Sequence, residues 1–194
     1  MTKHRCDWCV GDPLYEAYHD QEWGVPVYDD QTIFEFLILE TFQAGLSWIT
    51  ILRKRENFRE ALDDFDYKKI ARYSEDKLEA LLQNPGIIRN KLKVKATVSN
   101  AQAFIKIQEE FGSFSKYIWS FVNHKPIQNS VKIYKEAPAT TAISDALSKD
   151  LKKRGFKFTG STVVYAHMQA TGMVNDHEVD CFRYAEVKSL GVKP

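Results

Sequence analysis

The two ends of the chain each carry side chains of the kind that bind transition metals. Cys6, Cys9 and His19 lie near the N-terminus, and His177 and Cys181 lie four residues apart near the C-terminus. Thiolate and imidazole are ligands of closed tetrahedral zinc sites, and residues four apart share one face if the segment is helical. A metal bound by both groups would join ends that otherwise tend to fray. Unrelated buried thiols and histidines are the alternative, and they explain one Cys–His pair better than two.

The composition is that of an ordinary globular protein. The chain has 194 residues, 44% of them hydrophobic, which is enough for one sizeable core. It has no apolar run of about 18 residues and no signal-peptide pattern at its start, so we expect a cytoplasmic protein without a membrane span. Three cysteines are an odd number, which argues against a disulfide framework and for a reducing compartment.

The charge is nearly balanced, but basic residues cluster in two places. The net charge is only +1, so the whole molecule does not attract nucleic acid strongly. The clusters are Arg89, Lys91, Lys93 and Lys95, and Lys149, Lys152, Lys153, Arg154 and Lys157. Local basic patches on a near-neutral protein suit modest contact with phosphates, whereas solvated helix faces are the alternative explanation.

The apolar periodicity predicts a mostly helical chain. We expect helix caps at Asp29 or Asp30, at Ser47 and at Ser113. Residues 123–140 have little periodicity, and the only weak alternating patterns are at 127–133 and 157–158. No repeat or linker separates two cores, so a single domain over 1–194 is expected. The predicted helices cover residues 13–20, 32–42, 47–62, 74–83, 88–110, 113–121, 141–154 and 160–172.

Two acidic residues interrupt a segment that is otherwise apolar all round. Residues 32–42 should form a buried helix, which contains Glu35 and Glu40. A buried carboxylate must be paired, protonated or functional, and periodicity does not distinguish the two. Glu40 is closer to residues 43–48, Gln-Ala-Gly-Leu-Ser-Trp, which combine a flexible turn, an apolar side chain and an aromatic ring. An ion pair, or a solvated position at the helix end, is the alternative for Glu40.

Residues 81–91 follow the plan of a DNA-binding hairpin between two helices. A helix, a Pro85-Gly86 turn and a basic helix start follow one another. In a helix-hairpin-helix motif the turn amides and the second helix N-terminus contact a DNA phosphate. The usual second glycine is Ile88 here, so the match is partial, and a simple helix connection explains it equally well.

Aromatic residues are abundant, and aromatic faces are platforms on which nucleobases stack. Burial in the core is the alternative for each of them. No phosphate-binding loop or dinucleotide motif is present, so we expect no nucleotide cofactor. The aromatic residues that stand out are Trp8, Tyr15, Tyr18, Trp23, Trp48 and Trp119.

Taken together, these segments resemble the type I DNA-3-methyladenine glycosylase family over nearly the whole chain. The combination is far more specific than any one motif. The matching stretches are Cys6-x-Trp8, Asp12-Pro13-Leu14-Tyr15, Tyr18-His19-Asp20-x-Glu22-Trp23-Gly24, Glu40, Gln43-Ala44-Gly45-Leu46-Ser47-Trp48-Ile49-Thr50, Trp119-Ser120-Phe121-Val122-Asn123, Leu147-Ser148-Lys149, Gly155-Phe156-Lys157-Phe158, and Gly172-x-Val174-Asn175-Asp176-His177 with Cys181.

The resemblance implies an all-α fold of the helix-hairpin-helix DNA glycosylase group, with its hairpin at about 78–95. It also implies a structural Zn²⁺ that joins the terminal segments, because four protein ligands leave no open coordination position. Cys9 in place of His19 would also complete a tetrahedral set, but the neighbours of His19 belong to a matched stretch. The implied ligands are Cys6, His19, His177 and Cys181.

The implied activity is hydrolysis of the N-glycosidic bond of 3-methyladenine in alkylated double-stranded DNA, after base flipping. Glu40 matches a glutamate that contacts the base and serves catalysis. Tyr18 and Trp48 match aromatic pocket walls, and Trp23 is expected to be a further wall. The implied DNA contacts are Gly45 and Leu46 at the tip after Glu40, and Gly86 and Arg89 at the hairpin.

The residues after the hairpin bear on the type of glycosylase. Residues 92–100 contain no aspartate, and no lysine can be placed as a Schiff-base nucleophile. Both absences suit a monofunctional enzyme that uses water and does not cut the strand. A damaged-DNA-binding module that lost activity, and a zinc-stabilised helical interaction domain, are the alternatives. Nothing in the chain calls for more than a monomer.

Overall fold

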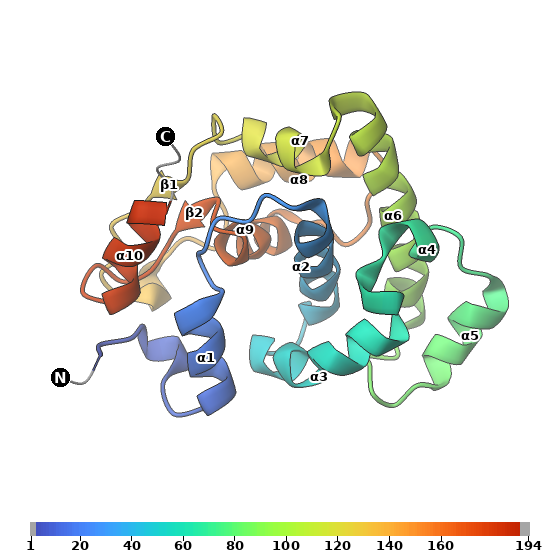
Figure 1. The fold of residues 1–194 in the computed structure, drawn as a ribbon, viewed down its shortest axis with the longest axis horizontal. Helices are drawn as coiled ribbons and strands as arrows, with labels where there is room; N and C mark the ends of the chain where they lie inside the picture. Colours follow the sequence, from blue (N-terminus) through green and yellow to red (C-terminus); the bar gives the residue numbers. More distant parts are fainter. Residues whose placement is uncertain (1–2, 191–194) are drawn as a thin grey trace.

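The computed structural model describes residues 3–190, and this part of the chain is mostly helical (Figure 1). Two short strands pair in parallel, Ile127 with Val174 and Gln128 with Asn175. The helices are α1 (Pro13–Gln21), α2 (Asp30–Gln43), α3 (Trp48–Ala61), α4 (Tyr67–Ile70), α5 (Glu75–Gln83), α6 (Lys91–Phe111), α7 (Phe114–Ser120), α8 (Ala142–Lys153), α9 (Ser161–Ala170) and α10 (Phe182–Leu190), with strands β1 (Ile127–Gln128) and β2 (Val174–Asn175) and short 3-10 helices η1 (Asp7–Cys9), η2 (Asp63–Phe65) and η3 (Tyr134–Glu136).

Helix α2 is the centre of the fold. Every residue from 33 to 42 is buried, as expected for a helix that is apolar all round. The helix packs against α3, α6, α7 and α9 (Figure 1). The Asp29 side chain caps it by accepting a hydrogen bond from the Thr32 N–H at 2.8 Å. This central position explains why α2 can carry a functional side chain into the interior.

Capping hydrogen bonds explain which of the predicted helix boundaries agree with the structure. The Ser113 cap is confirmed, since its hydroxyl accepts a hydrogen bond from Lys116 N–H at 3.0 Å. Ser47 is the residue before α3, but its hydroxyl pairs with Thr50 Oγ1 and makes no cap bond. The predicted helix start at residue 88 is wrong by three residues. Asn90 accepts hydrogen bonds from the N–H groups of residues 92 and 93, and therefore α6 begins at Lys91.

The structure also decides three points that the sequence left open. Residues 127–133 contain the two-residue strand β1 and an isolated bridge from Val131 to Glu178. Residues 157–158 form no strand, because Phe158 has φ +58° and Asn100 holds the backbone N–H and carbonyl of Lys157. The segment from His177 to Cys181 is not helical. It is a turn in which Cys181 N–H donates to the Glu178 carbonyl at 2.9 Å, and α10 starts only afterwards.

The turn after α2 is held in place by a buried lysine. Lys93 on α6 donates from Nζ to the carbonyl oxygens of Phe42 and Ala44, both at 3.0 Å. These carbonyls lie at the C-terminal end of α2, where a cation is favourable. Lys93 is only 7% exposed, so the basic cluster at 89–95 is not simply a solvated helix face. The contact fixes the tip formed by Gly45 and Leu46.

Gly172 lies where two backbone segments touch, and its replacement should be costly. It has φ +69°, and a Cβ there would lie 2.4 Å from backbone atoms of Val25 and Pro26. We expect Gly172→Ala to lower the free energy of unfolding by about 3 kcal/mol or more in urea titrations, because backbone atoms must move.

Gly155→Ala is the matched control for this prediction. Gly155 has φ +99°, and its Cβ would meet nothing within 4 Å. Its cost should be only the positive-φ strain of about 1 kcal/mol. Equal losses for the two variants would contradict the close approach at Gly172.

Candidate functional site

Aromatic side chains from the N-terminal segment, α1, α3 and η3 enclose a cavity of about 100 Å³. Their rings pack on one another, edge to face for Trp8 and Trp23 with centroids 5.0 Å apart, and tilted for Tyr18 and Trp48 with centroids 5.7 Å apart. Aromatic walls suit a flat ring as ligand. The predicted residues Tyr18, Trp23, Trp48 and Glu40 all line this cavity. The full lining is Trp8, Tyr15, Tyr18, Trp23, Glu40, Gln43, Trp48, Tyr134, Ala166 and Gln169.

The two acidic residues of α2 have opposite environments. Glu35 forms ion pairs with Arg55 at 2.6 Å and with Arg59 at 2.8 Å. Glu40 is 3% exposed, and its Oε2 has no hydrogen-bond partner among residues 3–190. Burial raises the pKa of Glu40 from 4.5 to about 8. The ion pair considered for Glu40 therefore belongs to Glu35, and Glu40 carries the uncompensated carboxyl.

Two indole N–H groups of the pocket share this lack of partners. Trp8 Nε1 and Trp48 Nε1 are buried and have no hydrogen-bond acceptor within residues 3–190. An unsatisfied buried polar group costs about 1–3 kcal/mol, so native proteins rarely keep several together. One carboxyl and two indole donors around one cavity are therefore typical of a site for a flat ligand that carries both donors and acceptors.

The buried carboxyl predicts a pH-dependent change in stability. The folded protein holds the Glu40 proton up to about pH 8, whereas the unfolded chain loses it near 4.5. The stability contributed by the protonated form is complete below 4.5 and is lost as pH rises to about 8. The rise from 4.5 to about 8 corresponds to about 5 kcal/mol, at about 1.4 kcal/mol for each pKa unit. We therefore expect Glu40→Gln to raise the Tm by about 10–20 °C at pH 8.5.

The same substitution should change the Tm little at pH 5, where Glu40 is protonated in the folded protein. The wild-type protein measured beside the variant at each pH removes pH effects that both share. Equal shifts of the Tm at pH 5 and pH 8.5 would contradict the buried, uncompensated carboxyl.

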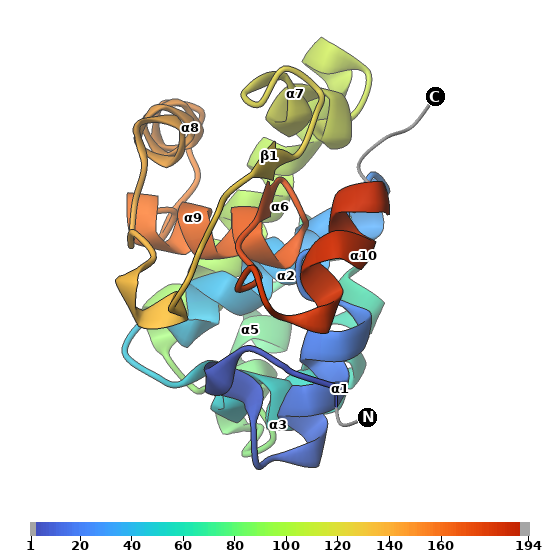
Figure 2. The ribbon, with the colours of Figure 1, turned by 90° about the vertical axis from the view of Figure 1, so that its left-hand side faces the viewer.

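Three lining residues lie outside every motif singled out in the sequence. Tyr134 comes from the poorly patterned 123–140 segment, and Ala166 and Gln169 come from the inner face of α9. Figure 2 shows the segment between β1 and α8 running down the molecule before it turns back up to α8. This segment contains η3, whose Tyr134 lines the pocket. The Tyr134 ring packs on Trp8 and Trp23, with centroids 6.0 and 5.7 Å away. Among the aromatic residues noted in the sequence, Trp119 is core, with Nε1 donating to the Val27 carbonyl.

The predicted DNA contacts lie outside the pocket, at two places. Gly45 and Leu46 line a wider neighbouring cavity of about 550 Å³, which shares Tyr134 and Gln169 with the pocket. Leu46 is 40% exposed. Gly86 and Arg89 do not reach either cavity. Gly86 lies in the turn between α5 and α6, where its carbonyl accepts from Lys54 and Asn57, and exposed Arg89 lies beside the same turn.

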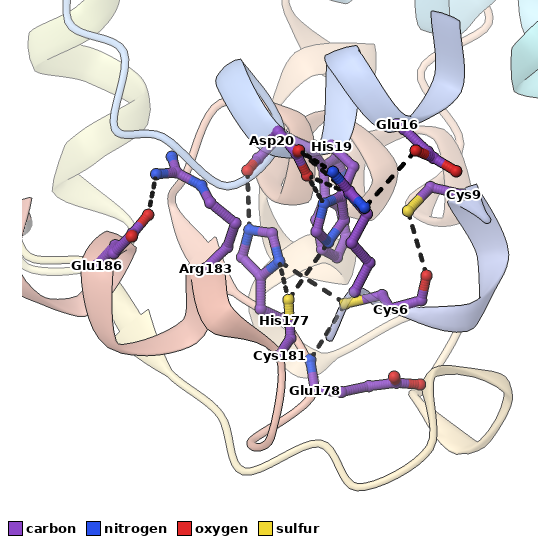
Figure 3. Close-up of polar contacts among 12 residues, drawn as sticks. Cys6, Cys9, Glu16, His19, Asp20, His177, Glu178, Cys181, Arg183 and Glu186 are labelled. Carbon is purple, nitrogen blue, oxygen red and sulfur yellow. Dashed lines mark hydrogen bonds and ion pairs between the residues drawn. The ribbon is translucent and has the colours of Figure 1, made fainter. Parts of the chain in front are cut away.

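A second cluster of side chains lies beside the pocket and can hold a metal ion. One ligand atom each from Cys6, His19, His177 and Cys181 lies within 4.8 Å of the others, and all four residues are buried (Figure 3). Cys9 does not belong to this group, and its Sγ donates to the Cys6 carbonyl at 3.2 Å. The structure therefore selects His19 over Cys9 in this cluster.

The surroundings of the four residues fit a metal ion. His19 Nδ1 contacts Asp20 Oδ1 at 2.8 Å, and His177 Nε2 contacts the Trp23 carbonyl at 3.0 Å. The other ring nitrogens face Cys181 Sγ at 3.4 and 3.7 Å. Metal-binding histidines are usually oriented by such outer acceptors. Hydrogen bonding between the two thiols raises the pKa of Cys6 and lowers that of Cys181, whereas a divalent cation would favour both thiolates.

The cluster is physically connected to the pocket. Glu178 donates its N–H to Cys6 Sγ at 3.4 Å and accepts the Tyr134 N–H at 2.7 Å through its carboxylate. The Trp8 ring packs edge-on against His19 at 5.4 Å. Together with the bond from His177 to the Trp23 carbonyl, these contacts attach three pocket walls to the cluster.

Comparisons with known proteins place this chain and its helical fold among the DNA glycosylases. Residues 8–184 match the family model described as methyladenine glycosylase. The chain belongs to the methyladenine glycosylase family, and the family resemblance in the sequence is thereby confirmed.

Individual relatives agree with this family. DNA-3-methyladenine glycosylase 1 of Escherichia coli (strain K12) is 51% identical over 180 residues, covering 93% of this chain and 96% of the relative. The crystal structure of a 3-methyladenine DNA glycosylase I matches with a TM-score of 0.90 and 51% identity, over 92% and 98% of the two chains. The Staphylococcus aureus enzyme, whose structure concerns 3-methyladenine recognition, matches with a TM-score of 0.89 and 37% identity, over 98% and 97%.

No helix within residues 3–190 has both the length and the apolar character needed to cross a membrane.

Proposed function

We propose that this protein is a monofunctional DNA-3-methyladenine glycosylase that hydrolyses the N-glycosidic bond of 3-methyladenine in alkylated double-stranded DNA. The observation that carries the proposal is the unpaired, buried Glu40 carboxyl inside an aromatic cavity. Similar proteins are named for the same activity, including the 51% identical Escherichia coli enzyme. The catalytic and base-binding roles given below are part of the proposal.

The pocket chemistry suits a methylated adenine. Methylation at N3 makes the base in DNA cationic and a good leaving group, so the enzyme needs little acid catalysis. Glu40 accepts a hydrogen bond from the exocyclic amine of the flipped base, and its ionised form favours the cationic base and an oxocarbenium-like sugar. Tyr18, Trp23 and Trp48 stack on the base, and the close fit of the pocket rejects normal bases.

The DNA is held outside the pocket. Gly45 and Leu46 form the tip that approaches the duplex, where Leu46 fills the gap left by the flipped nucleotide. Gly86 and Arg89, in the turn between α5 and α6, contact the DNA backbone as a helix-hairpin-helix motif does. We assign these roles to one domain over 1–194 that acts as a monomer.

The metal site is proposed to hold Zn²⁺ in a structural role. Cys6, His19, His177 and Cys181 would supply all four ligands, which leaves no position for a reacting water. When bound, the ion would supply a fixed link between the terminal segments. The chemistry on DNA is assigned to the pocket residues alone.

Truncating the tip should slow base release without unfolding the protein. Leu46 is 40% exposed, so Leu46→Ala should change the Tm little and lower the single-turnover rate on duplex DNA about 10- to 100-fold, through the lost wedge. The control Leu190→Ala removes a leucine that is 50% exposed on α10. An equal rate for Leu46→Ala and wild type on duplex DNA would exclude the wedge.

Base release from methylated DNA tests the proposal. Duplex DNA treated with a methylating agent is incubated with the protein, and the free bases are identified by chromatography. We expect 3-methyladenine without 7-methylguanine, and no strand cleavage. Binding to the methylated duplex without release of any base would contradict the enzyme and favour a damage-binding module.

A further inference from the structure

Gln169 reaches the base pocket from α9, and nothing in the proposed mechanism uses it. It is 6% exposed and lines both the aromatic pocket and the wider cavity beside it. Its side-chain amide has a donor end and an acceptor end, so its orientation decides what it offers to a ligand. The neighbouring residue Asp176 fixes that orientation.

The Asp176 carboxylate is buried and accepts three hydrogen bonds. Its Oδ1 accepts from Asn129 Nδ2 at 2.6 Å, and its Oδ2 accepts from Tyr165 OH at 2.7 Å and from Gln169 Nε2 at 2.8 Å. A turned amide would place the Gln169 oxygen against a carboxylate oxygen, so two acceptors would oppose each other. The amide nitrogen therefore faces Asp176, and the carbonyl oxygen faces away from it.

The Gln169 Oε1 atom has acceptor capacity to spare. Its protein partner is Tyr134 OH at 3.4 Å, which is long for a bond between two oxygens. A carbonyl oxygen can accept two hydrogen bonds. Since Tyr134 also lines the pocket, this oxygen lies at the pocket boundary beside a ring wall.

We propose that Gln169 is a specificity-determining residue, whose Oε1 is a second hydrogen-bond acceptor for the flipped base, and that Asp176 positions it. The inference rests on the proposed function. A methylated adenine presents an exocyclic amine with two N–H donors, whereas a methylated guanine presents a carbonyl oxygen at that position. Two acceptors, Glu40 and Gln169, satisfy the amine and oppose the carbonyl. A site built to hydrogen-bond one group rejects an analogue that lacks it.

The test uses free 3-methyladenine and free 3-methylguanine as probes, with binding followed by the fluorescence of the pocket tryptophans. Gln169→Met keeps a side chain of similar length without the acceptor. We expect the ratio of the 3-methylguanine Kd to the 3-methyladenine Kd to fall about tenfold, mainly because 3-methyladenine binds more weakly. A ratio that stays within about twofold of wild type would overturn the inference.

Asp176 is tested by the same ratio, which a merely structural role would not move. In Asp176→Asn the new side chain has a donor as well as an acceptor, so the Gln169 amide can bond to it in either orientation. The Gln169 oxygen then faces the base only part of the time, and the ratio of the two Kd values should fall about threefold. The matched control Tyr165→Phe removes another donor from the same carboxylate oxygen and should leave the ratio unchanged. A lowered ratio in Tyr165→Phe and an unchanged ratio in Asp176→Asn would overturn the positioning role.

Failure of the inference and failure of the proposed function give different results. A wild-type protein that releases no base from methylated DNA would overturn both, since the inference rests on the proposed function. A wild-type protein that prefers 3-methyladenine, with the same preference in Gln169→Met, would overturn the role of Gln169 alone.

Discussion

Glu40→Gln is expected to slow the release of 3-methyladenine at least about 100-fold in single-turnover experiments, because it removes the charge that stabilises the cationic base and sugar. The ionised carboxylate that provides this charge lowers the stability of the folded protein, since burial raises the Glu40 pKa to about 8. The variant should therefore be more stable than wild type above neutral pH while it is much less active. A gain in stability with a loss of rate separates a functional residue from a structural one.

Glu35→Gln is the matched control on the same helix. Glu35 is paired with Arg55 and Arg59. Its loss removes the buried one of the two carboxylates that each arginine contacts, leaving Glu22 for Arg55 and Glu56 for Arg59, and should lower the stability. The rate of base release per folded molecule should stay close to wild type. The account would be wrong if the two glutamine variants had the same stability and the same rate.

Cys181→Ser is expected to remove the bound metal and to lower the Tm by at least about 10 °C, because structural zinc sites contribute several kcal/mol to folding. Cys181 lies in the four-residue cluster that joins the terminal segments. The metal content of the purified variant, measured by atomic absorption, should fall from one equivalent to near zero. Binding of free 3-methyladenine should weaken as well, because Tyr134 is attached to the cluster through Glu178.

Cys9→Ser distinguishes the two ligand sets that the sequence allows. Cys9 is also buried, but its Sγ contacts the Cys6 carbonyl and lies outside the cluster. This variant should keep its metal and most of its stability. Loss of the metal in Cys9→Ser, with full retention in Cys181→Ser, would contradict the assigned ligands.

Local side-chain chemistry explains which parts of the fold could be predicted. Helix α2 was predicted because apolar residues lie on all of its faces, and the Asp29 side chain caps its start. The start of α6 was predicted three residues too early. The Asn90 side chain accepts hydrogen bonds from the first free N–H groups of the helix, and the helix therefore begins after Asn90. Residues 157–158 do not form a strand because the Asn100 side chain makes two hydrogen bonds to the Lys157 backbone. Asn100 is 57 residues away in the chain, so no local sequence pattern indicates this contact.

In the candidate site, too, residues in sequence motifs were predicted and residues placed by long-range contacts were not. Tyr18, Trp48 and Glu40 stand in matched stretches, and their convergence on one cavity was expected. Apolar periodicity alone could not distinguish Glu35 from Glu40, since the difference depends on arginines of α3 that reach only Glu35. Tyr134 was missed because its place depends on a bond to Glu178, which lies 44 residues away in the chain.

The most direct test of the central claim is the titration of the Glu40 carboxyl by carbon-13 NMR, in the free protein and with bound 3-methyladenine. In the free protein we expect a pKa of about 8. A base that donates its amine to Glu40 favours the ionised carboxylate, so binding should lower this pKa by at least about one unit. A Glu40 titration that is unchanged or raised by bound 3-methyladenine would contradict the claim that this carboxylate recognises the base.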